Sequence, residues 1–262
     1  MPITEPQPRY QQIADVLREA IERGDYAPGS TLEPELTLAE RHNVNKRTVN
    51  MAIRLLRADG LVHVERGART VVRELPVLRR DASARQRIRE QGQARGAFQA
   101  ELERLGIEAH SNVSVSEQIA PDDVAELLGI DPATPALARR RHMLADHTPV
   151  QLATSWLPMD LAAGTPIAEV DTGPGGIYSR LADLGHGPAE FTETIRLRLP
   201  DPDERTVLRM DVEQRVYAIR RTAADADGRI VEVNDMVLPA HQWELVYTWE
   251  ESQLCVLYKP RA

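Results

Sequence analysis

The segment 45–60 constrains the fold most, because it combines an apolar stripe with a basic face at the period of a helix. The apolar stripe consists of Val49, Ala52, Ile53 and Leu56. A second face carries Arg47, Asn50, Arg54 and Arg57. Asn45 suits the N-terminal cap of this helix and Gly60 suits its end. A cationic helix indicates a polyanionic partner, and an α-helix fits the major groove of DNA. The alternative is a solvated surface helix.

The distribution of charge supports a nucleic-acid partner for the first part of the chain only. The protein has 262 residues and a net charge of -8, yet residues 1–75 carry equal numbers of acidic and basic side chains. No acidic residue lies between positions 41 and 58. The length suits one large or two medium domains. A neutral head with one basic face, joined to an acidic body, is typical of a DNA-binding module attached to a second domain.

Cysteine usage and hydropathy indicate a cytoplasmic protein without a membrane anchor. Cys255 is the single cysteine, so no internal disulfide can form, which fits a reducing compartment. No apolar run approaches the length of a membrane span, and the N-terminus lacks the apolar core of a signal peptide. We therefore expect a cytoplasmic location and no membrane partner.

Two further helices are predicted before the basic one. The first has an apolar stripe formed by Tyr10, Ile13, Ala14, Leu17 and Ile21. The second is short, over residues 35–42, and Asn43 suits the turn that follows, because asparagine tolerates a left-handed backbone. A helix, a short turn and a second helix that is basic near its start form a helix-turn-helix, whose second helix enters the groove by its N-terminus.

A β-hairpin is predicted next. The apolar segments 61–64 and 70–72 flank the polar tip 65–69. Arg66 and Arg69 at this tip could reach phosphates or the minor groove. Hairpin tips are also charged simply because they are exposed, but the position directly after a basic helix favours a role in DNA binding.

Five separated blocks in this region resemble the winged helix-turn-helix of GntR-type transcription regulators. They are the segments 10–14, 24–29, 38–41, 47–49 and 58–62, and the resemblance extends over about residues 8–73. It implies a DNA-binding domain over residues 1–75 and a double-stranded operator as partner. By position, Glu35, Lys46, Thr48, Gly67 and Arg69 match residues that the family uses at the DNA.

The expected DNA-binding set combines that resemblance with the basic face and the hairpin. It consists of Arg9, Glu35, Asn45, Lys46, Arg47, Thr48, Asn50, Arg66, Gly67 and Arg69. Leu36 and Asn50 depart from the family, because arginine is frequent at both positions. Asn50 could instead make a bidentate contact with adenine.

The second part of the chain is predicted to be an α+β domain over residues 95–262, connected by an exposed linker over residues 76–94. Strands are expected at 137–144, 150–157, 190–199, 215–222 and 230–238, with a short helix at 121–129 and another from 177. Strands separated by short helices and hairpins favour an antiparallel sheet. Residues 171–176 form a glycine-rich loop before the helix at 177.

The order of these segments resembles the UTRA effector-binding domain of the HutC branch, whose fold is shared with chorismate lyase. The matching segments are 139–141, 148–158, 176–178, 191–193 and 227–233, within about residues 95–248. The resemblance implies a small-molecule effector bound between the sheet and flanking loops, and dimerisation through this domain. Ala153 replaces a glutamate of sugar-phosphate-binding members, which argues against an amino-sugar phosphate.

The expected effector-binding residues are Arg141, Gln151, Ser155, Gly176, Tyr178, Glu193 and Glu232. The resemblance places Arg141 and Glu232 at pocket positions, and guanidinium groups suit carboxylates or phosphates, so the effector could be anionic. At least one of Arg139, Arg140 and Arg141 should be an exposed strand charge. Glu193 suits a surface cross-strand pair as well as a ligand. The loop that ends at Gly176 offers backbone N–H groups to an anion.

Enzyme chemistry finds little support in the sequence. The histidines are dispersed without metal-ligand spacing, and neither a nucleophile elbow nor a P-loop occurs. We expect no catalytic site, no metal and no cofactor. The sequence favours a homodimeric, ligand-responsive transcription regulator, a repressor that its effector releases from a pseudo-palindromic operator. The alternatives are a constitutive DNA-binding protein without an effector and a lyase-like enzyme.

Overall fold

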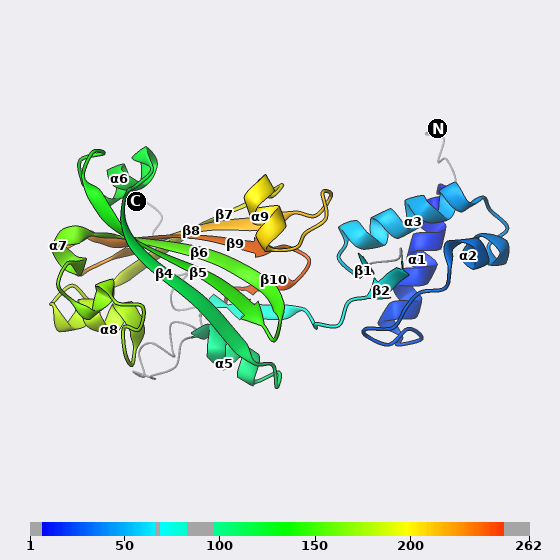
Figure 1. Ribbon diagram of the computed structural model, residues 1–262, viewed down its shortest axis with the longest axis horizontal. Coiled ribbons are helices and arrows are strands. Elements are labelled where there is room, and N and C mark those ends of the chain that lie inside the picture. Colours follow the sequence, from blue (N-terminus) through cyan, green and yellow to red (C-terminus); the bar gives the residue numbers. More distant parts are fainter. Residues whose placement is uncertain (1–6, 66–68, 83–96, 249–262) are drawn as a thin grey trace, which may run out of the picture. The chain divides into compact units, whose positions relative to one another are not determined.

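The computed structural model describes residues 7–65, 69–82 and 97–248 (Figure 1). The chain divides into two compact units. The first contains Met1–Val77, Leu199–Val216 and Pro239–Gln242. The second contains Leu78–Arg198, Tyr217–Leu238 and Trp243–Ala262. None of the helices in the described ranges is long and apolar enough to cross a membrane.

The first unit contains the predicted three helices and hairpin. The helices are α1 (Arg9–Glu22), α2 (Glu35–Arg41) and α3 (Lys46–Ala58). Strands β1 (Val62–Glu65) and β2 (Arg69–Val72) pair antiparallel, with Val62 opposite Val72. The turn between α2 and α3 contains Asn43 at φ 51°, the left-handed conformation expected there. The side chain of Asn45 caps α3 by accepting a hydrogen bond of 2.9 Å from the Thr48 N–H.

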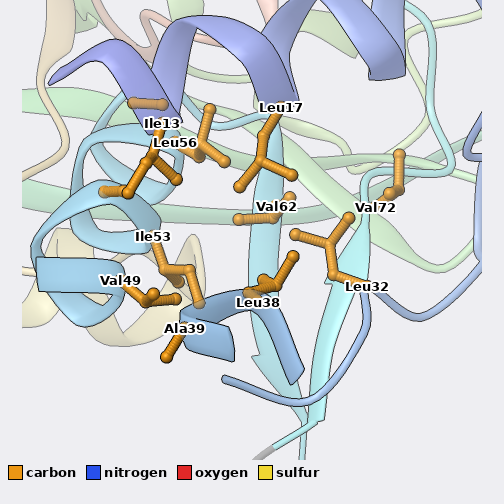
Figure 2. Packing of buried hydrophobic residues seen from close by; sticks show 12 residues of the cluster. Ile13, Leu17, Leu32, Leu38, Ala39, Val49, Ile53, Leu56, Val62 and Val72 are labelled. Carbon is orange, nitrogen blue, oxygen red and sulfur yellow. The ribbon is translucent and has the colours of Figure 1, made fainter. Parts of the chain in front are cut away.

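Residues from every one of these elements form one apolar core (Figure 2). Ile13 and Leu17 of α1 pack with Leu38 of α2 and with Val62 and Val72 of the hairpin. The predicted apolar stripe of α3 points into this core, because Val49, Ala52, Ile53 and Leu56 are all buried. Burying a side chain of this size contributes about 1.5–3 kcal/mol, so this stripe fixes how α3 is rotated in its unit.

The last turn of α3 is held within the first unit by the segment 199–216. The Arg57 guanidinium forms an ion pair with Asp211, and the Gln214 side chain donates to the Arg57 carbonyl at 2.9 Å. Helix α9 (Pro202–Val207) begins this stretch with a capping box between Asp201 and Glu204. Arg57 belongs to the basic face in the sequence, but its charge is neutralised by Asp211.

The second unit is built on a six-stranded sheet in the order β4-β5-β6-β9-β8-β7. The strands are β4 (Ala109–Ile119), β5 (Pro135–Ala145), β6 (Thr148–Pro158), β7 (Glu190–Arg198), β8 (Val216–Ala224) and β9 (Ile230–Pro239). Strand β4 pairs antiparallel with β5, β5 with β6, and β6 with β9. The predicted α+β class with an antiparallel sheet is therefore confirmed.

Short helices cover the two faces of this sheet. The elements are α5 (Ala97–Glu103), α6 (Asp122–Leu128), α7 (Met159–Ala162), a 3-10 turn (Pro166–Ala168) and α8 (Gly176–Asp183). Helix α6 packs on Trp156 and Val233, whereas α8 packs with Leu137 and Leu157. Consecutive residues of β8 point to these two opposite faces. Arg220 pairs with Asp123 of α6, and Arg221 bonds to Tyr178 of α8.

Strand β3 (Leu78–Asp81) lies inside the predicted linker and pairs in parallel with β10 (Trp243–Val246). Leu78 and Arg80 of this strand are buried, so the chain at this point is not the exposed linker that its composition indicates. The indole N–H of Trp243 donates to the Val150 carbonyl at 2.7 Å and joins β10 to the main sheet. Residues 83–94 of the predicted linker lie outside the described residues.

Candidate DNA-binding and effector sites

The outer side of α3 presents exposed cations. Lys46, Arg47 and Arg54 are exposed, whereas Val49 on the opposite side is fully buried. Lys46 lies 3.2 Å from a carboxylate oxygen of Glu35, the first residue of α2. An exposed pair of this kind contributes little to stability, so the lysine can exchange Glu35 for a phosphate at low cost.

Asn50 faces the same carboxylate. With its amide oriented to donate, its nitrogen lies 2.7 Å from each oxygen of Glu35. Glu35, Lys46 and Asn50 therefore form one polar cluster at the junction of α2 and α3. Leu36, next to Glu35, is exposed, so the α2 position where the family often has arginine carries no charge here.

The remaining predicted DNA-binding residues have different surroundings. The Asn45 side-chain oxygen accepts from the Thr48 N–H and from the Thr48 hydroxyl at 3.0 Å, so this pair orders the start of α3. Arg9 is exposed at the first residue of α1. Arg69 is exposed in β2 and pairs with Glu65 across the hairpin at 3.3 Å. Arg66 and Gly67 lie outside the described residues.

In the second unit, three strands bring polar side chains together on the face that α8 covers. The Arg141 guanidinium of β5 donates to the Ser155 hydroxyl of β6 at 2.6 Å and to the Asn234 amide oxygen of β9 at 3.4 Å. Alternation along the strands places these residues on one face. Arg141 and Ser155 were expected there from the sequence, whereas Asn234 was not.

A buried triad lies beside them. The Tyr178 hydroxyl of α8 donates to Glu232, and Arg221 donates to that hydroxyl at 2.7 Å. Arg221 also lies 3.7 Å from the Glu232 carboxylate, whose side chain is fully buried. The Arg221 guanidinium stacks 5.6 Å from the ring centre of Tyr178 and 5.7 Å from that of Phe191. We call Arg141, Ser155, Tyr178, Arg221, Glu232 and Asn234 the effector cluster.

Electrostatics keep the Arg221 end of this triad charged. Burial lowers the pKa of Arg221, but the neighbouring Tyr178, Glu232 and Glu193 raise it above its ordinary value. One carboxylate oxygen of Glu232 and the Arg221 Nε are buried without a hydrogen-bond partner among the described residues. Unsatisfied buried groups of this kind are costly, and a polar ligand can satisfy them.

Arg221 was missed by reasoning from the sequence. The available signal was the pair Arg220-Arg221 in a predicted strand, because consecutive strand residues face opposite sides and one of two arginines must then point inward. The expectation that one of Arg139, Arg140 and Arg141 is an exposed strand charge is wrong, because each has protein partners and none is fully exposed. Arg139 is buried and donates to backbone carbonyls of the segment 167–170. Arg140 bonds to Gln118 at 2.6 Å.

Glu193 has a buried partner, so the expectation of a surface cross-strand pair is wrong. Its carboxylate binds the Arg80 guanidinium of β3, with Arg80 Nη1 3.0 Å from Oε2, and accepts from the Tyr247 hydroxyl at 2.9 Å. Its side chain is 14% exposed, and that of Arg80 is 1% exposed. Burial raises the pKa of Glu193, but the bonds from Arg80 and Tyr247 and the charge of Arg221 bring it below its ordinary value.

Gln151 and Gly176 complete the predicted effector set. Gln151 is buried in β6, and its amide oxygen has no hydrogen-bond partner in the described part of the chain. Gly173, Gly175 and Gly176 all have positive φ, and a Cβ at Gly175 would meet the Ser179 hydroxyl at 1.9 Å. The Gly176 N–H already bonds to the Gly173 carbonyl at 3.2 Å, which makes this loop a weaker anion site than its composition indicates.

Residues that could hold a metal do not gather in the described ranges, where no group of three or more His, Cys, Asp or Glu side chains forms a candidate site. The polar groups of the effector cluster are instead two guanidinium groups, two hydroxyls, one amide and one carboxylate. Such a set suits an organic molecule with both anionic and hydrogen-bonding groups better than a metal ion.

Comparison with known proteins gives two family matches. Residues 9–72 match the family described as bacterial regulatory proteins, gntR family, and residues 93–243 match the UTRA domain. An HTH-type transcriptional regulator of Streptomyces coelicolor is 31% identical over 86% of each chain. The HTH-type transcriptional repressor PhnF of Mycolicibacterium smegmatis is 28% identical over 78% of each. A crystal structure of a putative GntR-family regulator has a TM-score of 0.59 and 26% identity, covering 93% of this chain and 98% of the other.

Proposed function

Because the chain belongs to the GntR family of bacterial regulatory proteins and carries a UTRA domain, we propose that it is a DNA-binding transcription regulator, a repressor that a small-molecule effector releases from its operator. The observation that supports this most is the start of α3. Its apolar stripe is buried and its exposed side presents Lys46, Arg47 and Arg54. A helix held in this way can enter the major groove by its N-terminus.

The contacts at the duplex divide by type. Lys46, Arg47 and Arg54 neutralise phosphates, and Arg69 reaches the backbone from the hairpin. Asn50 contacts a base edge once its amide is released from the Glu35 carboxylate. Adenine is the base that asparagine binds through two hydrogen bonds. Because Leu36 carries no charge, more of the contacts that recognise DNA come from α3 than from α2.

The experiment is footprinting of purified full-length protein on genomic DNA, followed by fluorescence anisotropy on the duplexes it protects. We expect protected pseudo-palindromic sites, with affinity that falls as salt concentration rises. A protein that protects no site and ignores duplex DNA even at low salt would overturn the proposal.

The effector is an organic anion that also carries hydrogen-bonding groups. Arg141 and Arg221 suit its anionic group, while the Glu232 carboxylate and the polar groups of Ser155, Tyr178 and Asn234 bind the rest. Screening of metabolites by thermal shift tests this, because a ligand present at 100 times its Kd stabilises the fold by about 2.7 kcal/mol. No stabilisation by any metabolite favours a constitutive DNA-binding protein, and turnover of chorismate by the full chain would establish the lyase-like alternative.

The regulator acts in the cytoplasm as a homodimer, whose two heads read half-sites about one helical turn apart. Strand β7 lies at the edge of the sheet and exposes Ile195 and Leu197, with Leu199 just beyond its end. An apolar stripe on an edge strand supports association with a second copy. We expect Leu197→Asp to yield monomers by light scattering, whereas the control Val170→Asp, at another exposed apolar position, keeps the dimer. A monomeric wild-type chain, or a dimeric Leu197→Asp variant, would exclude this interface.

A further inference from the structure

Arg80 is buried although it lies in the segment that connects the winged hairpin to the sheet domain. Strand β3 begins at Leu78, shortly after β2 ends at Val72, and Arg80 is 1% exposed. Its neighbour Arg79 is exposed, as a linker residue would be. Burying a guanidinium is costly unless it is paired, so its position calls for a specific partner.

That partner is Glu193 of β7. Arg80 binds the two carboxylate oxygens through its two terminal nitrogens, which is the bidentate geometry of a strong pair. The Tyr247 hydroxyl, just after β10, donates to the same carboxylate at 2.9 Å. This carboxylate therefore joins β3 to β7, in addition to the pairing of β3 with β10 and the burial of Leu78.

Glu193 also belongs to the electrostatic surroundings of the effector cluster. It lies two residues from Phe191 on β7, and the Arg221 guanidinium stacks 5.7 Å from the Phe191 ring centre. The charge of Arg221 stabilises the Glu193 carboxylate, and Glu193 in turn helps to keep Arg221 charged. The charges Arg80, Glu193, Arg221 and Glu232 thus alternate in sign from the connecting strand to the cluster.

We propose that Arg80 is the positioning residue through which the charge of the effector cluster controls how firmly β3 is docked. This rests on the proposed function, because it assumes an anionic ligand beside Arg221. An added anion there makes the local potential at Arg80 more negative and strengthens its docking. Since β3 is the first strand after the winged hairpin, the ligand then restricts the chain that leads to the DNA-binding domain, which couples the two sites.

The test uses Glu232→Gln, which removes one negative charge from the cluster and keeps a side chain that Tyr178 can bind. The effect is opposite to that of an added anion, so β3 should loosen. We expect hydrogen exchange of the β3 amides to become about three- to tenfold faster in the full-length chain, a size typical of coupled neighbours. In the Arg80→Gln background, where exchange is already fast, Glu232→Gln should add nothing.

Three controls make each result decisive. Asp235→Asn on the same strand faces the opposite side of the sheet, where it pairs with Arg220, and Arg79→Gln removes the exposed neighbour of Arg80. Both should leave β3 exchange unchanged. The amides of β5 report global opening. The inference is overturned if Glu232→Gln leaves β3 unchanged, if β5 accelerates by the same factor, or if the effect persists without Arg80.

Anisotropy on the same proteins separates this inference from the proposed function. A wild-type chain that ignores duplex DNA overturns the regulator proposal but leaves the dependence of β3 on Glu232 measurable. A chain that binds DNA while β3 is insensitive to Glu232 overturns the role of Arg80 alone.

Discussion

At the scale of single residues, the exposed cations at the start of α3 carry the proposed DNA contacts. We expect Lys46→Ala and Arg47→Ala each to weaken operator binding and to lower the slope of log affinity against log salt by about one. Fluorescence anisotropy across a salt series measures both quantities. Arg23→Ala, which removes an exposed arginine that follows α1 and pairs with Asp25, is the matched control. An unchanged slope in both α3 variants would contradict the phosphate contacts.

Gly60 is a second residue for which the backbone conformation and a close neighbour both require glycine. It has φ +68° at the end of α3, and an added Cβ would lie 2.1 Å from the His241 ring. A left-handed backbone costs a non-glycine residue about 1–2 kcal/mol, and the clash adds to this. Gly24 has φ +84° with nothing within 4 Å of a Cβ, so Gly24→Ala isolates the backbone cost. In urea unfolding, Gly60→Ala should lower the free energy of unfolding more than Gly24→Ala. Equal losses would mean that the His241 ring moves aside without a measurable cost.

At the scale of elements, the buried side of α3 fixes which residues face outward. Leu56 is fully buried in the core of the first unit, whereas Met51 on the same helix is 40% exposed. We expect Leu56→Ala to cost about 2–5 kcal/mol of unfolding free energy, because it removes apolar contacts and leaves a cavity. Met51→Ala should cost far less. Chemical denaturation followed by circular dichroism gives both values, and similar losses would contradict the assigned rotation of the helix.

At the scale of the whole molecule, stability should depend on the protonation of His241. Burial lowers its pKa from 6.5 to about 4, with the charge of Arg73 acting in the same direction. The unfolded chain therefore binds a proton more readily than the folded one between these values. The resulting stability is present above pH 6.5 and is lost as pH falls towards 4, by about 1.4 kcal/mol for each pH unit.

His241→Gln isolates this contribution, because glutamine does not titrate. We expect the unfolding free energy of this variant to fall less steeply between pH 6.5 and 4 than that of the wild type. The exposed His63 serves as the control, and His63→Gln should retain the wild-type slope. Identical slopes in all three proteins would mean that folding does not lower the pKa of His241.

The sequence alone determined the elements and chemistry that depend on short-range pattern. The apolar period of α3, the cap at Asn45 and the turn at Asn43 were all predicted, because each depends on residues a few positions apart. The helix-turn-helix, the hairpin and the antiparallel sheet followed from the same local signals. Arg141, Ser155, Tyr178 and Glu232 were likewise assigned to one site from matched segments. Arg141 bonds to Ser155 and Tyr178 bonds to Glu232, while their role as one effector site stays a prediction.

Only the tertiary structure decided which charges are buried together. Arg57 meets Asp211, Arg80 meets Glu193, and Arg221 joins Glu232, and in the first two pairs more than a hundred positions separate the partners. Composition indicated that Arg80 is a linker residue, and the helical period placed Arg57 on the basic face. Both were expected to be exposed, because a charged side chain is usually exposed. Burial of a charge depends on a compensating partner, and that partner is specified by packing rather than by any local pattern.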